Sequence, residues 1–540
     1  MTTTLRIFMT GIALLMMHSQ ALANICFELP SFPTGNYQFD DSIAVESYDG
    51  TPIAANLFTP TSEPPEAGFP AIIFVNSWVL DEHQYLLQAR QFAEKGYLVL
   101  SYSARGWGCS GGKVNVTGDK DIQDLTAVVD WLEAYTHIDS ANIGISGISY
   151  GSGISLMGLA KEPRIKTAVA MSTWASLTDS LYQHQTPRMF WGFFLVSSGL
   201  LTANMDPVIA ENYSNLIFHN RIPETLEWAE QRSVKNWINL INERGAPVYL
   251  ANNFGDNLFQ PNNLLKFYQS LTVPKKLDLS QGTHASAEGF GLVGLNNYTW
   301  NNTHRWFDYW LKNKDTGINE QPNVSMDVAG STPREHFSNW PISDEFTKAY
   351  FLQARGLFSN GKLRQSPYQP WWPKSNRIYS GLDTFATTGI PVLSEILDAH
   401  VNVPVKTPIN LISRINGIVF KSSTLDEALK IRGIPKLELF VKPNLAQMQL
   451  NAYLYDVDRH GVGTLITHGP VTKYDTSAGE RIKLQWEMVA TAYDVPRGHK
   501  LAIVFDTFDV LYAVPTILPY SISFEFRDGL DSTLNLPLVP

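Results

Sequence analysis

Residues 142–151 read Asn-Ile-Gly-Ile-Ser-Gly-Ile-Ser-Tyr-Gly, and this stretch decides the fold. Its start predicts a strand over Asn142–Ser146, and the apolar residues that follow predict a helix over Tyr150–Ala160. Between them lies a G-x-S-x-G motif, whose small residues let a helix pass close to the preceding strand. Ser149 is then expected to project its hydroxyl from a sharp turn, as a nucleophile. An ordinary glycine-rich turn is the alternative, so the position between strand and helix carries the argument.

Strands and helices alternate around this motif, from about residue 43 to about residue 170. The expected buried strands are 71–75 and 97–101, and the expected helices are 84–95 and 121–135. Such alternation is typical of a mostly parallel sheet with helices on both faces.

The alternation is interrupted once and then ends. Residues 175–244 are helical in pattern and rich in aromatic side chains, so they read as an insertion into the α/β unit. Later, short strands separated by turn residues predict an all-β sandwich. The expected division is a signal peptide (1–23), a core in two parts (24–174 and 245–335), a helical cap (175–244) and a β-sandwich (336–540).

The amino terminus has the features of a secretory signal. Arg6 precedes the mostly apolar stretch Ile7–Met17, and Ala21-Leu22-Ala23 supplies small residues for cleavage after Ala23. The apolar stretch is too short to span a bilayer, although a short membrane anchor is the alternative. We therefore expect a secreted or periplasmic protein without stable membrane insertion. Cys26 and Cys109 are free to pair in such a compartment, but their spacing does not decide whether they do.

Composition excludes several classes of protein. The 540 residues are 12% aromatic and 17% charged, which does not fit a disordered chain. There are 41 basic and 51 acidic residues, a net charge of −10, and no basic run that nucleic acid would require. Two cysteines are too few for a thiolate metal cluster, and no His/Asp/Glu motif has catalytic metal-ligand spacing. We expect no metal and no cofactor.

Two further residues complete a candidate catalytic triad. Asp256 follows the expected strand Pro247–Ala251, and His284 follows the expected strand Lys276–Leu279. The order Ser, Asp, His is the one that a nucleophile elbow of this kind requires. A histidine with a purely structural role is the alternative reading of His284.

The motif also predicts where an oxyanion is stabilised. The backbone N–H of Tyr150 is one expected donor, and the loop Asn76-Ser77-Trp78 should provide the other. Trp78 could donate from its backbone or its indole, or could simply line the pocket. The expected pocket residues are Trp174, Phe190, Trp191 and Phe259.

A glycine-rich loop over Arg105–Gly112 does not resemble a phosphate-binding loop. It lacks the Lys-Ser/Thr ending and does not open directly onto a helix. We interpret it as a shaping loop near the site, with Arg105 in a structural role.

Together these features resemble the bacterial cocaine esterase/X-prolyl dipeptidyl-peptidase group of serine hydrolases. The resemblance rests on Asp49-Gly50-Thr51, the Arg105–Gly112 loop, Asp124–Trp131, the elbow at Ser149, Gly255-Asp256, Gly282-Thr283-His284, Arg305–Lys312, Leu454–Asp458 and Pro496–His499. It implies an α/β-hydrolase core with an inserted helical cap, followed by a jelly-roll sandwich. It also implies the triad Ser149, Asp256 and His284.

Two departures from the group limit what the resemblance implies, the first for the oxyanion hole and the second for the substrate. Trp78 stands where the group usually has a tyrosine that completes the oxyanion hole. Related α-amino-acid ester hydrolases carry acidic residues just after the catalytic aspartate, whereas Asn257–Gln260 contains none. Cap residues Glu224, Glu227 or Glu230 are the other candidates for holding a substrate ammonium group.

These observations predict a serine esterase that acts on small-molecule esters with a hydrophobic acyl or alcohol part. X-prolyl dipeptidyl-peptidase activity on short peptides is the first alternative. A non-catalytic protein that binds carbohydrate or cell-wall polymer is a distant one. The sequence leaves the natural substrate and the oligomeric state open.

Overall fold

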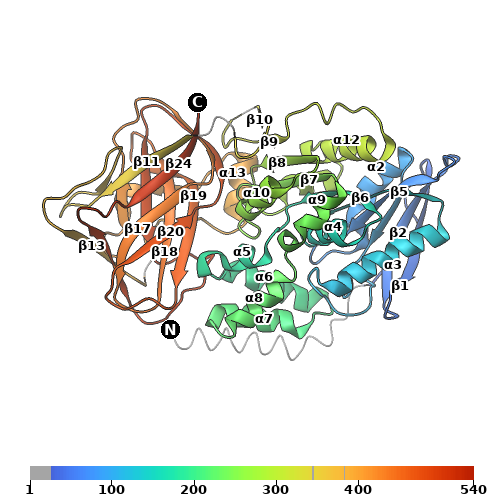
Figure 1. Ribbon diagram of the computed structural model, residues 1–540, viewed down its shortest axis with the longest axis horizontal. Helices are drawn as coiled ribbons and strands as arrows, with labels where there is room; N and C mark the ends of the chain where they lie inside the picture. The colour runs from blue at the N-terminus through green and yellow to red at the C-terminus, as the bar shows by residue number, and fades with distance from the viewer. Residues whose placement is uncertain (1–25, 332, 343–345, 382) are drawn as a thin grey trace.

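A computed structural model describes residues 26–331, 333–342, 346–381 and 383–540. An α/β part and an all-β part lie side by side along the long axis of the molecule (Figure 1). The expected signal peptide lies outside the described residues. Among the helices that the structure does describe, none has the length and apolar character needed to cross a membrane.

The first part is built on a ten-stranded sheet in the order β1-β2-β4-β3-β5-β6-β7-β8-β9-β10. Neighbouring strands from β4 to β9 are parallel, while the outer strands β1, β2 and β10 pair antiparallel. The strands are β1 (Tyr37–Glu46), β2 (Pro52–Pro60), β3 (Phe69–Val75), β4 (Leu98–Tyr102), β5 (Ile138–Ile148), β6 (Ile165–Met171), β7 (Val248–Asn253), β8 (Lys275–Ser280), β9 (Val324–Met326) and β10 (Glu335–Phe337).

Helices cover both faces of this sheet, as β3 illustrates. Every residue of β3 is buried, which is the pattern of a parallel strand covered on two sides. Ile73 joins one apolar cluster with α3, α4 and α10, while Phe74 joins another with α2 and α12. The helices are α2 (Leu86–Glu94), α3 (Asp119–Tyr135), α4 (Tyr150–Lys161), α10 (Pro261–Ser270), α11 (Ser286–Leu292) and α12 (Tyr298–Lys312). The predicted α/β-hydrolase architecture is confirmed.

Helices inserted between β6 and β7 form the cap. They are α5 (Leu177–Tyr182), α6 (Met189–Thr202), α7 (Pro207–Phe218), α8 (Ile222–Glu230) and α9 (Ile238–Arg244). Helix α6 contains the most apolar internal run of the sequence, yet only Trp191, Val196 and Gly199 are fully buried in it. In Figure 1 the cap helices α5, α6, α7 and α8 lie in the lower centre, beside the all-β part, whereas α9 lies close to β7.

The second part is the predicted all-β domain. Its strands form one connected set, antiparallel except for the β12–β15 pair, and they enclose a main apolar core and a second, smaller apolar cluster. The strands are β11 (Phe346–Gln353), β12 (Gly361–Arg364), β13 (Lys374–Tyr379), β14 (Lys406–Pro408), β15 (Ile418–Lys421), β16 (Leu429–Gly433), β17 (Lys436–Pro443), β18 (Met448–Val457), β19 (Val462–Lys473), β20 (Ile482–Glu487), β21 (Thr491–Val495), β22 (Lys500–Asp506), β23 (Ser521–Phe526) and β24 (Thr533–Val539).

Two details differ from the sequence expectation. The all-β part begins later than residue 336, because β10 pairs with β9 and extends the first sheet. In addition, the helix α13 (Leu393–Val401) lies between β13 and β14, where only strands and turns were expected. This helix contacts the α/β part, because its Glu395 accepts a hydrogen bond from the side chain of Asn257.

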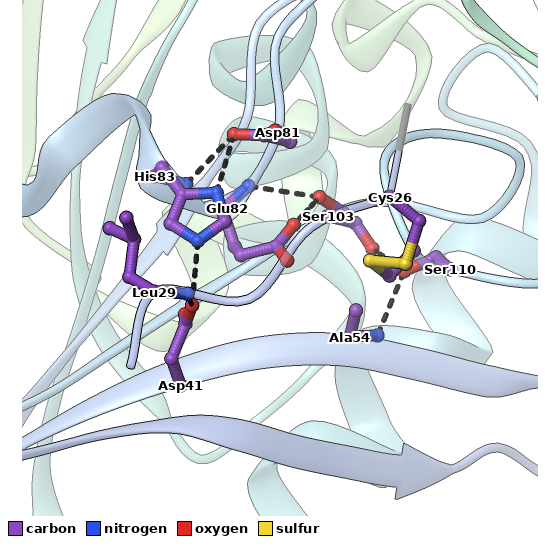
Figure 2. Close-up of a disulfide and its surroundings, with 10 residues drawn as sticks. Cys26, Leu29, Asp41, Ala54, Asp81, Glu82, His83, Ser103 and Ser110 are labelled. Carbon is purple, nitrogen blue, oxygen red and sulfur yellow. Dashed lines mark hydrogen bonds and ion pairs between the residues drawn. A yellow bond between two sulfur atoms is a disulfide. The ribbon is translucent and has the colours of Figure 1, made fainter. Parts of the chain in front are cut away.

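A disulfide joins Cys26 to Cys109 across 83 residues (Figure 2). It ties the first described residue to the glycine-rich loop between β4 and α3. Phe27 then stacks on the imidazole of His83, with ring centroids 4.7 Å apart. The backbone N–H of Leu29 donates to Asp41 at 2.5 Å. The amino-terminal segment is therefore held against the core by one covalent and two non-covalent contacts.

Candidate active site

The G-x-S-x-G motif forms the turn between β5 and α4. Ser149 has a φ angle of 57°, in the left-handed region that residues other than glycine rarely adopt. A Cβ atom on Gly147 would lie 2.4 Å from the backbone of Gly151, and one on Gly151 would lie 2.0 Å from the carbonyl oxygen of Val75. Both glycines are thus required by close backbone approach, and the turn is a nucleophile elbow.

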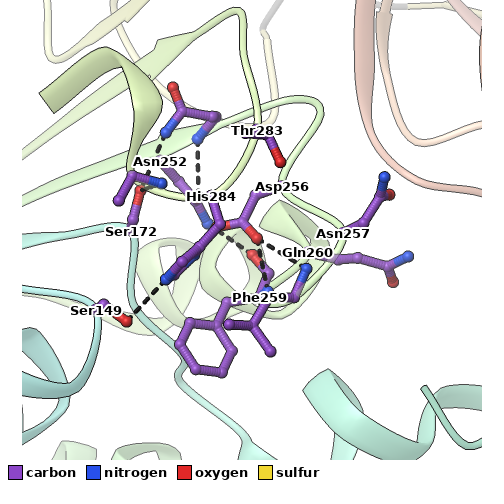
Figure 3. A network of polar contacts seen from close by, with 12 residues as sticks. Ser149, Ser172, Asn252, Asp256, Asn257, Phe259, Gln260, Thr283 and His284 are labelled. Atoms are coloured by element: carbon purple, nitrogen blue, oxygen red, sulfur yellow. Dashed lines mark hydrogen bonds and ion pairs between the residues drawn. The ribbon is translucent and has the colours of Figure 1, made fainter. Parts of the chain in front are cut away.

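The structure brings Ser149, His284 and Asp256 into one hydrogen-bonded chain (Figure 3). His284 Nε2 lies 2.7 Å from Ser149 Oγ, and His284 Nδ1 lies 2.8 Å from Asp256 Oδ2. The three residues follow β5, β8 and β7 at the carboxyl edge of the sheet. This geometry lets His284 accept the serine proton while Asp256 stabilises the resulting imidazolium.

Asp256 is held by backbone groups as well as by His284. Its carboxylate is completely buried, and Oδ1 accepts hydrogen bonds from the backbone N–H groups of Leu258 and Phe259 at 2.9 and 2.8 Å. The acid of the triad is therefore oriented before any substrate binds.

A second buried carboxylate, Glu288, lies beneath the histidine loop, and no motif in the sequence marks it. Glu288 accepts from Ser172 Oγ at 3.1 Å and from Asn253 Nδ2 at 3.0 Å. Ser172 Oγ in turn accepts from the backbone N–H of Ala285, next to His284. Burial raises the pKa of Glu288 above its ordinary value. We assign this network the task of fixing the loop that carries His284.

The oxyanion donors are only partly as expected. Tyr150 is the first residue of α4, so its backbone N–H is free of helical hydrogen bonds and stands beside Ser149. The Trp78 indole does not face the serine, because it donates to Leu195 O at 3.1 Å and to Ser198 Oγ at 3.3 Å on α6. The backbone N–H of Trp78 accordingly remains the candidate for the second donor.

A cavity of about 100 Å³ reaches Ser149 beneath the cap. Trp174 and Phe259 line it as expected, whereas Phe190 and Trp191 do not. Trp191 instead packs edge-on against His284 with ring centroids 5.9 Å apart, because its position on α6 directs it toward the triad. The remaining wall is formed mainly by apolar residues of α5, α6, α7 and α8.

Arg105 has the structural role that was expected. Its side chain is buried and donates to both carboxylate oxygens of Asp124, at 2.5 and 2.7 Å, and to Asp49 at 3.2 Å. These bonds fix the glycine-rich loop against α3, and Trp107 of this loop packs against Trp78 and Tyr150 beside the site.

One group of side chains among the described residues has donor atoms close enough to hold a metal ion. Asp41, Glu82 and His83 bring their ligand atoms within 4.8 Å of one another near the disulfide (Figure 2). No sequence motif marks this group, because Asp41 lies on β1, far along the chain from the other two residues. Hydrogen bonds of 2.9 and 3.1 Å already join His83 to Asp41 and Asp81. The group is separate from the triad.

Comparison with known families agrees with this architecture. Residues 49–286 match the model of the X-Pro dipeptidyl-peptidase (S15 family). Residues 316–523 match the model of the X-Pro dipeptidyl-peptidase C-terminal non-catalytic domain. The chain belongs to the S15 family of serine hydrolases. Membership confirms the family suggested by the sequence motifs.

Individual relatives of this S15 protein are distant. A Bacillus cereus protein, whose name places it among the Xaa-Pro dipeptidyl-peptidases, is 20% identical over 394 residues. That match covers 68% of this chain and 61% of the relative. The chain thus spans less than two thirds of the length of the first curated relatives that it matches.

Two solved structures share the fold over nearly the whole chain. A CocE/NonD family hydrolase from Staphylococcus aureus has a TM-score of 0.73 at 15% identity, covering 93% of this chain and 94% of that one. An α-amino acid ester hydrolase has a TM-score of 0.69 at 14% identity, covering 94% and 98%. At these identities the likeness concerns the fold alone.

Proposed function

We propose that this S15 protein is a carboxylic ester hydrolase that acts outside the cytoplasm on esters with a hydrophobic acyl or alcohol part. The cavity at Ser149 carries the proposal, because its wall is largely aromatic and aliphatic and contains no carboxylate among the described residues. Apolar pockets of this kind bind substrates mainly through buried surface area.

The triad geometry supports an acyl-enzyme mechanism. Ser149 Oγ attacks the ester carbonyl while its proton passes to His284 Nε2, and the proton then goes to the leaving alcohol. Backbone N–H groups at Tyr150 and Trp78 stabilise the tetrahedral oxyanion. Water activated by His284 releases the acid in the second half of the reaction.

Dipeptidyl-peptidase activity is the alternative, and the names of the relatives favour it. That activity requires a group to hold the ammonium of a free peptide amino terminus, and a carboxylate is the usual partner for such a cation. Glu224, Glu227 and Glu230 are absent from the cavity wall, and Glu230 pairs with Lys235 at 3.0 Å instead. The pocket therefore favours an ester without a cationic group.

Two observations support a location outside the cytoplasm. The first is the signal-like composition of residues 1–23. The second is the Cys26–Cys109 disulfide, a bond that persists mainly in oxidising compartments. Fractionation of the expressing cell, together with the amino-terminal sequence of the mature protein, tests the proposal. Intact protein with residues 1–23 in the cytoplasm would contradict it.

One experiment separates the two activities. A single purified sample is assayed with 4-nitrophenyl hexanoate and with Ala-Pro-4-nitroanilide, and Ser149→Ala serves as the control. We expect efficient hydrolysis of the ester, little of the anilide and none of either by the variant. Preference for the anilide would overturn the proposal in favour of a dipeptidyl-peptidase. Absence of covalent labelling by a fluorophosphonate would favour a non-catalytic binding protein.

A further inference from the structure

The cavity that reaches Ser149 contains one charged side chain, that of Arg188. This residue immediately precedes α6, and only 4% of its surface is exposed. The other residues that line the cavity carry neutral side chains. A cation has therefore been placed in the wall of an otherwise uncharged pocket.

Arg188 has hydrogen-bond partners, but none of these partners carries a negative charge. Its Nε donates to the carbonyl oxygen of Ser180, and its Nη1 donates to that of Asn257 at 2.8 Å. The guanidinium carbon lies 5.7 Å from the ring centroid of Tyr512, which is a cation–π contact. All of these partners are neutral.

No carboxylate among the described residues forms an ion pair with Arg188 within 4.0 Å. Asp256 influences it from further away, but the oxygens of Asp256 already serve His284 and two backbone N–H groups. Burial lowers the pKa of Arg188 below its ordinary value, which agrees with a guanidinium that lacks a compensating charge. Burying an ion without a partner of opposite charge costs free energy, so an anionic ligand that pairs with Arg188 should bind more tightly than a neutral one.

We propose that Arg188 binds a carboxylate of the substrate, so that the preferred esters combine an apolar chain at Ser149 with a terminal carboxylate. A guanidinium presents five N–H donors, of which Nε and one on Nη1 donate to the backbone carbonyls of Ser180 and Asn257, so donors remain for a charge-assisted contact with a carboxylate. The same cation repels the ammonium of a peptide amino terminus. This inference rests on the proposed esterase function and narrows its substrate class.

The test compares esters that differ only in charge. Wild-type protein is assayed with mono-4-nitrophenyl adipate, its neutral methyl ester and 4-nitrophenyl hexanoate, and with the corresponding suberate and octanoate set. Because a hydrogen bond to a charged group is worth about 1.5–3 kcal/mol, we expect the carboxylate substrate to show at least about tenfold higher kcat/KM at one of the two lengths. Equal or lower values for the carboxylate substrates at both lengths overturn the inference without any variant being made.

Variants then assign the preference to Arg188. Arg188→Met removes the charge at similar length, and we expect it to abolish the preference while neutral esters are still hydrolysed. Arg188→Lys keeps the charge but loses the bidentate geometry, so part of the preference should remain. A preference that persists in Arg188→Met contradicts the assignment, and circular dichroism checks that each variant is folded.

Arg232 offers a matched control. It is also a buried cap arginine that donates to backbone carbonyls, those of Asn115 and Trp228, but it does not line the cavity. Arg232→Met should leave the ratio of charged to neutral substrate unchanged, and an equal loss in both variants would indicate a structural effect instead. If no ester is turned over at all, the proposed function itself fails. If neutral esters are turned over without preference for the carboxylate, only the present inference fails.

Discussion

Gln84 holds Ser77 through both ends of its side-chain amide. Its Oε1 accepts from the backbone N–H of Ser77 at 2.6 Å, and its Nε2 donates to Ser77 Oγ at 2.8 Å. Ser77 Oγ donates onward to the carbonyl oxygen of Ile148 at 2.9 Å, one residue before the nucleophile. The loop that carries Trp78 is thereby fixed against the elbow that carries Ser149.

Replacing Gln84 should therefore impair the oxyanion site more than substrate binding. We expect Gln84→Ala to lower kcat about tenfold to a hundredfold with little change in KM, because loss of a whole oxyanion donor costs about 10²–10³. Steady-state kinetics with 4-nitrophenyl hexanoate measure both constants. Gln84→Glu, which can accept from Ser77 N–H but cannot donate, should recover part of the loss. A change in KM alone would contradict a positioning role.

The hydrogen bond between Asp256 and His284 predicts the effect of an isosteric change in the acid. In Asp256→Asn, an amide N–H facing His284 Nδ1 favours the tautomer with a proton on Nε2, which cannot accept the proton of Ser149. By analogy with the serine protease triad, kcat should fall about 10⁴-fold while the fold is retained. Asp119→Asn, at an exposed position of α3, is the control and should be fully active. Retention of more than a tenth of wild-type kcat in Asp256→Asn would remove Asp256 from the triad.

The parts of this site that depend on local sequence could be predicted. The elbow is encoded within ten residues, since both glycines and Ser149 occupy one strand-to-helix turn. Asp256 and His284 were found because each follows a strand whose apolar run is clear. The chain order then placed all three residues at one edge of the sheet.

The parts that depend on distant contacts could not be predicted. The indole direction of Trp78 is set by carbonyl and hydroxyl groups of α6, 117 and 120 residues away. Arg188 is held by the Asn257 loop and by Tyr512 of the all-β part, both distant in the sequence, so no local pattern marks it as a pocket residue. Short edge strands such as β10 have only three residues, too few for their pattern of apolar residues to show which sheet they join.

The Cys26–Cys109 disulfide should contribute substantially to stability. A bond that closes a loop across 83 residues restricts the unfolded chain, and such bonds typically contribute about 2–4 kcal/mol. We expect Cys26→Ser to lower the free energy of unfolding by this amount, which appears as a lower urea midpoint. Dithiothreitol should lower the midpoint of the wild type to a similar value and leave the variant unaffected. An identical midpoint with and without reductant in the wild type would show that the bond is absent or energetically neutral.

Glu395 predicts a dependence of stability on pH. This residue of α13 reaches from the all-β part to the catalytic loop, where its Oε1 accepts from Asn257 Nδ2 at 2.5 Å. Its Oε2 has no hydrogen-bond partner among the described residues. Burial raises the pKa of Glu395 from 4.5 to about 7, so the folded protein holds this proton more tightly than the unfolded chain does. The protonated Glu395 therefore contributes its full stabilisation of the folded state below pH 4.5, and this contribution is lost as the pH rises through 7.

Glu395→Gln keeps an acceptor for Asn257 and removes the ionisation. We expect wild type and variant to unfold at similar urea concentrations near pH 4.5. By pH 9 the variant should be more stable by roughly 3 kcal/mol, because each pKa unit corresponds to about 1.4 kcal/mol. Equilibrium unfolding from pH 4.5 to 9 measures the difference. Glu224→Gln, at an exposed cap position, should follow the wild-type profile. Parallel profiles for wild type and Glu395→Gln would mean that Glu395 has the same pKa, near 4.5, in the folded protein and in the unfolded chain, and would contradict the prediction.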